Sequence, residues 1–216
     1  MSGTLQAVFQ NQRSFGLTIG DAYQGGFYAG QISTAGNSIA DYNLVIGPVA
    51  SAESSSKQWK NAMTATAGAD SVINGPQNTA DMVADGNSTV YPAAHFCNDL
   101  VIGGFSDWYM PAKNELEVCY SNLKPTTTSN NTGGTNGINA NSVPARASNY
   151  TAGTPAQTSA SDFKDTGAED FATVNYWSST ENSATYAESP TFDNGGQGTY
   201  NKSGSFRVRA VRRVAV

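Results

Sequence analysis

Two segments of the chain carry apolar residues at the spacing of a helix. In each segment the apolar positions recur at i, i+3, i+4 and i+7, which places them on one stripe of a helical surface. Proline at 92 and at 111 suits a first helical turn, because no backbone N–H is needed there. The pattern therefore predicts two short helices that begin at these prolines. Their stripes are Ala93, Phe96, Cys97 and Leu100, and Leu116, Cys119, Tyr120 and Leu123.

The connection between these helices, residues 103–108, is the Gly-Gly-Phe-Ser-Asp-Trp sequence that we call the glycine elbow. Its glycines favour a turn over a continuous helix. The two helices and the elbow are expected to pack together as the nucleus of a small α+β domain. Trp108 is interpreted as core and Asp107 as a local turn cap, with a ligand site at this pair as the alternative. Glu115 is interpreted as a charge partner for the N-terminus of its helix.

Turn residues and alternating apolar positions predict strands on both sides of the helices. Residues 17–32 read as a hairpin around a Gln-Gly-Gly turn, and residues 42–49 read as a buried strand. Residues 171–180 and 186–192 are further strand candidates. In residues 205–211 the apolar positions alternate with arginines, which predicts a half-buried strand with its arginines directed outward to acidic partners. An alternative is that these arginines contact an anionic glycan or a phosphate of lipopolysaccharide.

Two more short helices and two irregular segments complete the expected organisation. The helices are predicted over residues 54–63, which Trp59 would pin to the core, and over residues 77–83. Residues 1–15 are interpreted as an N-terminal arm or edge strand, and residues 16–216 as a single domain. Residues 124–161, almost entirely Thr, Ser, Asn, Gly, Ala and Pro, are an insertion that is either functional or disordered.

Composition narrows the class of protein. Of the 216 residues 38% are hydrophobic and only 13% are charged, so much of the polar content is uncharged, as in loop-rich proteins of extracellular or particle surfaces. The net charge of −5 argues against nucleic-acid binding, which needs a basic face. No run of about 18 apolar residues is present, so membrane insertion is not expected. Without a leader sequence, a protein working outside a cell needs another exit, such as lysis with a virus particle.

Cysteine and histidine usage leaves little room for metal or redox chemistry. Cys97 and Cys119 both lie on apolar stripes and are interpreted as buried free thiols, with a disulfide between the helices as the alternative. A zinc site is not expected, because His95 is the single histidine and no CxxC spacing accompanies it. No cofactor is expected. Calcium stays an alternative, because oxygen ligands are plentiful although no acidic cluster has a fixed loop spacing.

A series of short motifs, in order, resembles one known domain family. The strongest are Gly103-Gly104-Phe105-Ser106-Asp107-Trp108-Tyr109-Met110-Pro111 with Asn114-Glu115-Leu116, then Tyr176-Trp177-Ser178-Ser179-Thr180-Glu181, and the ending Phe206-Arg207-Val208-Arg209-Ala210-Val211-Arg212. They resemble the C-terminal domain of bacterial collagen-like adhesins, in which Leu usually replaces Met110. The resemblance covers nearly the whole chain apart from the arm and the insertion.

The resemblance implies a C-type-lectin-like fold, with two main helices packed on small twisted antiparallel sheets and long loops that carry binding. The same architecture occurs in receptor-binding tips of phage tail fibres, which are commonly trimeric. It therefore implies a virion or extracellular particle surface, a homotrimer, and other fibre subunits as partners. The Glu-Pro-Asn and Trp-Asn-Asp signatures of calcium-dependent sugar binders are missing.

Aromatic residues interleaved with Asn, Ser and Asp near the C-terminus favour a recognition surface, because Tyr offers rigid contact area and amides offer adaptable hydrogen bonds. An alternative is that these are core and ordinary turn residues. The expected ligand-binding residues are Tyr176, Ser178, Thr180, Glu181, Asn182, Tyr186, Asp193, Asn194, Tyr200 and Asn201. The expected core residues are Trp59, Phe96, Cys97, Trp108, Leu116, Cys119, Trp177 and Phe206.

Three functions are compatible with these observations. The first hypothesis is a non-enzymatic binding module, an adhesin of a phage tail fibre or particle surface that recognises a host glycan or protein. The second is a purely structural fibre or decoration protein. The third is an enzyme of the formylglycine-generating type, which needs reactive cysteines, whereas cysteines on buried stripes favour inert thiols.

Overall fold

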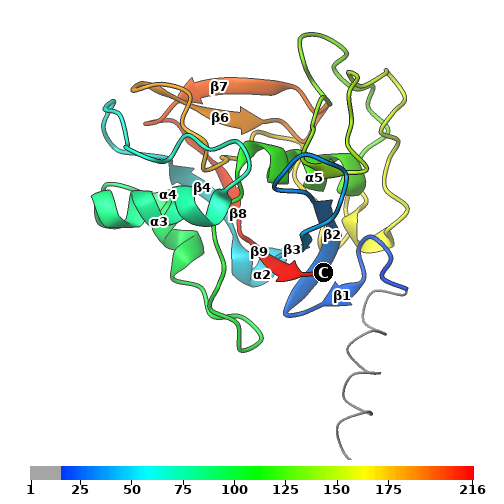
Figure 1. Ribbon diagram of the computed structural model, residues 1–216, viewed down its shortest axis with the longest axis horizontal. Coiled ribbons are helices and arrows are strands. Elements are labelled where there is room, and N and C mark those ends of the chain that lie inside the picture. The colour runs from blue at the N-terminus through cyan, green and yellow to red at the C-terminus, as the bar shows by residue number, and fades with distance from the viewer. Residues whose placement is uncertain (1–15) are drawn as a thin grey trace, which may run out of the picture.

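The computed structural model describes residues 16–216, and the predicted arm at 1–15 lies outside the described residues. Its largest sheet is antiparallel and five-stranded (Figure 1). The order is β1 (Ala22–Tyr23), β2 (Gly26–Ile32), β3 (Tyr42–Ile46) and β9 (Val211–Ala215), and β5 (Ser142–Val143) also pairs with β2. The predicted hairpin is confirmed as β1–β2. Its turn residues, Gln24 and Gly25, both have positive φ (48° and 87°), the geometry that suits the twist of a tight hairpin.

Two antiparallel ribbons complete the β structure. One pairs β4 (Glu53–Gln58) with β8 (Ser205–Arg209), and the other pairs β6 (Tyr186–Pro190) with β7 (Gln197–Asn201). The strand predicted over residues 205–211 is divided at Ala210, where the chain passes from the β4–β8 ribbon into the large sheet. Residues 171–180 form no named strand; isolated bridges at Asn175 and Tyr176 hold this segment to its neighbours.

The two main helices are confirmed as α4 (Pro92–Asn98) and α5 (Lys113–Leu123). The helix expected near residues 77–83 is α3 (Gly75–Asp85), and one turn, α2 (Val49–Ala52), precedes β4. The helix predicted over 54–63 is wrong, because residues 53–58 are strand β4. Pairing with β8 supplies backbone hydrogen bonds that outweigh the weak local preference for helix. Trp59 is nevertheless core, and its indole N–H donates to the carbonyl of Ser178 at 2.9 Å.

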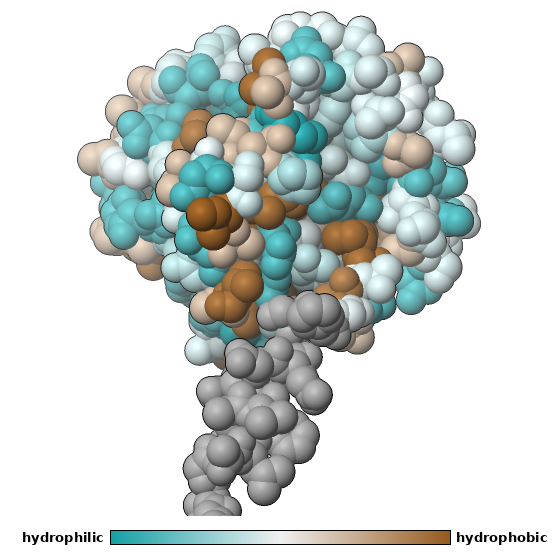
Figure 2. Space-filling view, turned by 45° about the vertical axis from the view of Figure 1, so that its right-hand side comes forward, coloured by the Kyte–Doolittle hydropathy of each residue, from teal (hydrophilic) through white to brown (hydrophobic). Residues whose placement is uncertain are grey.

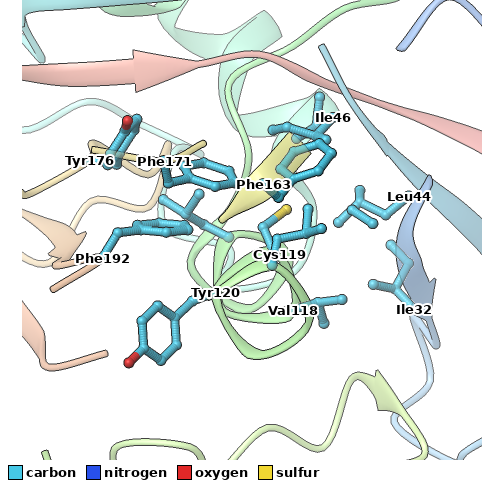
Figure 3. Close-up of a cluster of buried hydrophobic side chains, with 14 of the residues drawn as sticks. Ile32, Leu44, Ile46, Val118, Cys119, Tyr120, Phe163, Phe171, Tyr176 and Phe192 are labelled. Carbon is cyan, nitrogen blue, oxygen red and sulfur yellow. The ribbon is translucent and has the colours of Figure 1, made fainter. Parts of the chain in front are cut away.

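The expectation that α4 and α5 share one nucleus is wrong, because the helices serve two separate core clusters. Helix α4 packs on α3 and β4, whereas α5 packs on β2 and β6 (Figure 1). Cys119 of α5 lies among Ile46, Val118 and Phe163 in the first cluster (Figure 3). Cys97 of α4 lies in the second cluster with the three tryptophans. The two thiols are therefore free and buried, and no disulfide joins the helices.

Most of the expected core residues are buried. Phe96 and Phe206 differ from the others, because they are only partly buried and pack at the edge of the second cluster. The first cluster is built around stacked and edge-on aromatic rings, such as Phe171 over Phe192 at 3.9 Å between ring centroids. The fully or nearly fully buried members of the expected set are Trp59, Cys97, Trp108, Leu116, Cys119 and Trp177.

The arginines near the C-terminus do pair with acids, but only Arg207 is appreciably exposed, with 32% of its side chain accessible. Arg209 is fully buried, donates to Glu169 at 2.7 Å, and lies 4.8 Å from the centroid of Phe171. Arg212 binds both carboxylate oxygens of Asp107, at 2.7 and 2.9 Å. Asp107 is thus an ion-pair partner of strand β9 and not a local cap. The other two pairs are Arg207 with Glu53 and Arg213 with Glu115.

Residues 124–161 contain little regular structure, and their polar side chains tie them to the domain. Asn130 accepts a hydrogen bond from the Tyr120 hydroxyl at 2.7 Å and donates to the carbonyl of Pro155 at 2.9 Å. Buried Glu117 of α5 accepts from Arg146, Tyr150 and Asn139 of the same segment. Hydrogen bonds of amide and carboxylate side chains therefore hold this segment to the domain, whereas apolar packing holds the other elements together. The whole is a mixed α+β domain with antiparallel sheets.

Candidate functional site

The two exposed tyrosines of the expected recognition surface lie on the β6–β7 ribbon. Tyr186 is 45% exposed and Tyr200 is 40% exposed. In the register of the ribbon, Tyr186 faces Asn201 and Tyr200 faces Ala187. Directly opposed residues share one face and successive residues alternate, so the two tyrosines project from opposite faces. The structure therefore divides the expected surface in two.

Tyr200 is held in place by a second aromatic ring. Its ring meets Phe206 edge-on, with centroids 5.0 Å apart and planes at 83°. Such an edge-to-face pair adds stabilisation beyond the buried area. One part of the Tyr200 ring is thus fixed against β8, while the remainder is open to solvent. A ring that is both exposed and positioned is a platform on which a flat apolar surface can stack.

Beside Tyr200 lies a hollow of about 240 Å³. Its walls come from three places in the chain: the insertion, the turn between β6 and β7, and strand β7 itself. We call it the β7 hollow. The residues that line it are all uncharged: Asn131, Thr191, Asn194, Gly196, Gln197, Gly198 and Tyr200.

The turn that shapes the β7 hollow is fixed by local hydrogen bonds and by a glycine. Asn194 accepts the backbone N–H of Gly196 on its side-chain oxygen at 3.0 Å. Its backbone carbonyl accepts the N–H of Asn131 at 2.8 Å, which attaches the insertion to the turn. Gly195 has φ of +71°, and a Cβ there would lie 2.2 Å from the Tyr120 ring. Only glycine therefore allows the turn to lie so close to helix α5.

The side chain of Gln197 is unusual in its hydrogen bonding. Its side-chain nitrogen is the one buried side-chain N or O atom without a hydrogen-bond partner in the described part of the chain. An unsatisfied buried donor costs about 1–3 kcal/mol, so such groups are rare in native proteins and call for an explanation. Its backbone N–H is satisfied by the side-chain oxygen of Asn136 at 2.8 Å. The register of the ribbon places the Gln197 side chain on the face opposite Tyr200, and its unpaired nitrogen is shielded from solvent.

Several of the expected ligand-binding residues are buried in internal hydrogen bonds and are unavailable to a ligand. Tyr176 and Ser178 are fully buried, and Thr180 is 2% exposed. The Tyr176 hydroxyl accepts the N–H of Ala172 at 3.0 Å, and the Thr180 hydroxyl donates to the carbonyl of Ser71 at 2.9 Å. The expectation that these three bind a ligand is wrong. Their motif is structural, because its polar groups satisfy the backbone of neighbouring loops.

The remaining expected residues are scattered around the ribbon. Glu181 forms an ion pair with the buried Lys202, and Asn182 donates to Glu188 at 3.3 Å. Asn201 shares the face of Tyr186. Asp193 lies in the β6–β7 turn next to the hollow without lining it. Only Asn194 and Tyr200 of the expected set meet at the β7 hollow.

Sequence reasoning missed Asn131, Thr191 and Gln197. Thr191 and Gln197 flank the Asp193-Asn194-Gly195-Gly196 turn, so their proximity to it was readable from the chain. Asn131 is distant in sequence, and its amide is one of many in the insertion. Residue type alone does not separate the amides that face a hollow from those that support the fold.

Both cysteines lie in the core and not at the surface of the ribbon. In residues 16–216 no three His, Cys, Asp or Glu side chains gather as a metal site. Burial raises the pKa of both the Cys97 and the Cys119 thiol well above the ordinary value of 9.0, which disfavours the thiolate. The face seen in Figure 2 is a polar surface with small, separate apolar patches. Within residues 16–216 no helix has the length and apolar character to cross a membrane.

One family comparison matches this chain. The model of the Lcl C-terminal domain covers residues 51–212, which include the glycine elbow, the Trp-Ser-Ser motif and most of the closing arginines. The search among curated proteins found no match.

Proposed function

This chain belongs to the Lcl C-terminal domain family, and from that premise we propose that it is an adhesin-type module that binds a glycan on a host surface. The family supports the adhesin-type character. That the ligand is a glycan is the more specific part of the proposal. One observation carries it: an exposed, positioned tyrosine ring borders a hollow lined with uncharged amide and hydroxyl groups. A sugar needs both, a stacking face and paired hydrogen-bonding groups.

The fold and the setting belong to the same proposal. We propose a C-type-lectin-like arrangement, supported by the N-terminal hairpin and the C-terminal strand sharing one sheet while long loops lie beyond it. We also place the module on a virion or fibre surface as a homotrimer that contacts other fibre subunits. Light scattering of the purified chain tests this, since a trimer has three times the 22.6 kDa mass of the chain. A monomer at all concentrations contradicts it.

A non-enzymatic role accords with the chemistry of the cysteines. The formylglycine-generating alternative needs a thiolate, and neither Cys97 nor Cys119 reaches solvent. A nucleophile also needs an adjacent base. The single histidine, His95, lies on α4 two residues before Cys97, and one of its ring nitrogens is engaged at 2.7 Å with the carbonyl of Gly86 at the end of α3.

The proposed function is tested by binding to a panel of immobilised bacterial and eukaryotic glycans and to whole host cells. We expect the unmodified protein to bind, and Tyr200→Ala to weaken binding by about tenfold or more, as expected for loss of an aromatic anchor. Tyr186→Ala is the matched control, because this tyrosine is similarly exposed but lies on the opposite face. Thermal unfolding of both variants checks that the ribbon is intact.

Two results contradict the proposal. In one, the unmodified protein binds neither cells nor glycans, which favours a purely structural fibre protein. In the other, the unmodified protein binds and the two tyrosine variants lose binding equally. This result means that the ligand does not bind specifically at the face of the ribbon that carries Tyr200.

A further inference from the structure

We propose that the ligand of this module is a glycan chain of at least two linked sugar units, which crosses the rings of Tyr200 and Phe206 and occupies a hollow on each side of them. The inference rests on the proposed function and names the substrate class of that site. It follows from a second hollow, from the sheet face that this hollow shares with the β7 hollow, and from the two rings between them.

The second hollow lies at strand β8 and has a volume of about 400 Å³. We call it the β8 hollow. Val174 on its wall is 45% exposed, and Phe206 is partly buried, so apolar surface lies beside hydroxyl and amide groups. The β7 hollow combines the same kinds of group. The residues that line the β8 hollow are Ser55, Val174, Asn175, Ser205, Phe206 and Arg207.

Two contacts make the hollows neighbours. Tyr200 of the β7 hollow meets Phe206 of the β8 hollow edge-on, with 5.0 Å between the ring centroids. Thr191 of the β7 hollow and Asn175 of the β8 hollow are paired in an isolated antiparallel bridge. The walls of the two hollows therefore adjoin at two places.

The two hollows also share one face of a continuous β layer. The segment that carries Asn175 lies between β6 and β8, because the N–H of Trp177 donates to the carbonyl of Arg207 at 2.8 Å and the bridge from Asn175 reaches the end of β6. Side chains alternate along a strand, so Asn175 and Trp177 project from the same face. The Trp177 ring lies 4.7 Å from that of Phe206, and Phe206 contacts Tyr200. Both hollows thus open beside these aromatic rings.

Tyr200 and Phe206 form a ridge between the hollows. A Cβ at Gly198 would lie 3.0 Å from a ring carbon of Tyr200 and 3.5 Å from its hydroxyl oxygen. The missing side chain at this position therefore lets the Tyr200 ring lie along strand β7. Because Tyr200 is 40% exposed, the part of its ring that is turned away from the strand is open to solvent. A sugar unit can stack there while the units linked to it enter the hollows.

The polar groups of the β8 hollow suit a sugar and do not require an anion. The Asn175 side-chain nitrogen donates to the carbonyl of Ser189 at 3.1 Å, which fixes the amide and leaves its oxygen as an acceptor for a hydroxyl group. The hydroxyl of exposed Ser205 both donates and accepts. Arg207 is paired with Glu53 at 2.6 Å, so its charge is already compensated within the fold.

Two adjoining hollows favour a chain over a single sugar. A unit that is covalently linked to one already bound meets its own hollow at a raised effective concentration, so the chain binds more tightly than either unit alone. This gain is lost when the linked units cannot reach both sites at once. Because the walls of the hollows adjoin, directly linked units satisfy this condition. We therefore expect the module to select its ligand by length.

Two neighbouring serines provide a variant that fills the β8 hollow and a matched control. Ser55 and Ser56 are both exposed, and both lie in β4 where its pairing with β8 shifts register. Ser55 lines the β8 hollow, whereas Ser56 lines neither hollow. Tryptophan is favourable in strands, so Ser55→Trp puts a large side chain at the hollow and Ser56→Trp puts the same side chain beside it.

The experiment uses the full chain and the same panel of immobilised bacterial and eukaryotic glycans, in which each glycan is printed beside its component monosaccharides. We expect every glycan that binds to do so at least tenfold more tightly than any of its component monosaccharides. Ser55→Trp is expected to weaken glycan binding about tenfold, and Ser56→Trp to leave it unchanged. Thermal unfolding checks both variants, and the comparison of lengths needs only the unmodified protein.

The outcomes separate this inference from the proposed function. If a component monosaccharide binds as tightly as its glycan, or if Ser55→Trp binds as the unmodified protein does, the two-hollow site is overturned. Equal weakening by Ser55→Trp and Ser56→Trp overturns it as well. In each of these cases the adhesin function stands as long as Tyr200→Ala still weakens glycan binding. If the unmodified protein binds no glycan at all, both the inference and the proposed function fail.

Discussion

Arg213 of strand β9 donates from Nε to Oε1 of Glu115 at 2.8 Å, and this contact joins the last strand to the start of helix α5. Glu115 is fully buried and also accepts the N–H of Ala112 at 2.8 Å and of Gly75 at 3.2 Å. The Tyr109 hydroxyl donates to it as well. One carboxylate thus satisfies donors from α3, the loop before α5, and β9.

Replacement of Glu115 by Gln is expected to destabilise the domain by about 3–5 kcal/mol, because it leaves the guanidinium of Arg213 buried without a counter-charge. Urea unfolding measures the change. Asp165→Asn is the matched control, since it removes one exposed carboxylate and is expected to change stability by about 0.5 kcal/mol or less. Equal stabilities of the two variants contradict this role of Glu115.

The carboxyl of Glu53 is expected to make the unfolding free energy of the domain depend on pH. Burial raises the pKa of its carboxyl above the ordinary value of 4.5, although Arg209 and Arg207 act in the opposite direction. A folded-state pKa above the unfolded one gives a contribution that is complete below about pH 4.5 and is lost as the pH rises through the folded value. Glu53→Gln cannot titrate. We therefore expect the unfolding free energy of the unmodified protein, relative to this variant, to fall above pH 4.5 and then level off.

Urea unfolding of both proteins between pH 4 and 8 measures this difference. A difference that rises with pH contradicts the direction of the shift, and one that stays constant contradicts a perturbed Glu53.

The cysteines are expected to be unreactive in the native protein. Both thiols are buried, and desolvation raises the pKa of each, so the nucleophilic thiolate is scarce at neutral pH. A colorimetric thiol reagent should detect both cysteines in denaturant and neither in the folded state. Rapid labelling of the native protein contradicts the burial and revives the enzyme alternative.

The local sequence pattern was sufficient to predict the elements that depend on residues close together in the chain. Apolar stripes located α4 and α5, and the Gln-Gly-Gly turn located the first hairpin, because these features depend on neighbours in sequence. It failed for residues 54–58, where three serines before Trp59 resemble a helix cap. Their state is decided by pairing with β8, about 150 residues away in the chain, which no local pattern reports.

Residue type alone predicted only part of the candidate site. Exposed Tyr200 and the Asn194 turn were expected at a binding surface from their residue types. The burial of Tyr176, Ser178 and Thr180 was not, because a polar residue on an aromatic-rich segment is equally suited to a surface and to an internal hydrogen bond. Arg209 shows the same limit, since strict alternation placed it outside while Glu169 draws it into the core.

Four of the ion pairs made by the arginines of β8 and β9 have a consequence for synthesis. A chain leaves the ribosome from its N-terminus, so Glu53, Asp107, Glu115 and Glu169 are all made before Arg207, Arg209, Arg212 and Arg213. Until those arginines emerge, burying Glu53, Glu115 and Glu169 leaves uncompensated charge, so the nascent domain stays open. Assembly of this domain therefore awaits strands β8 and β9, which carry the arginines.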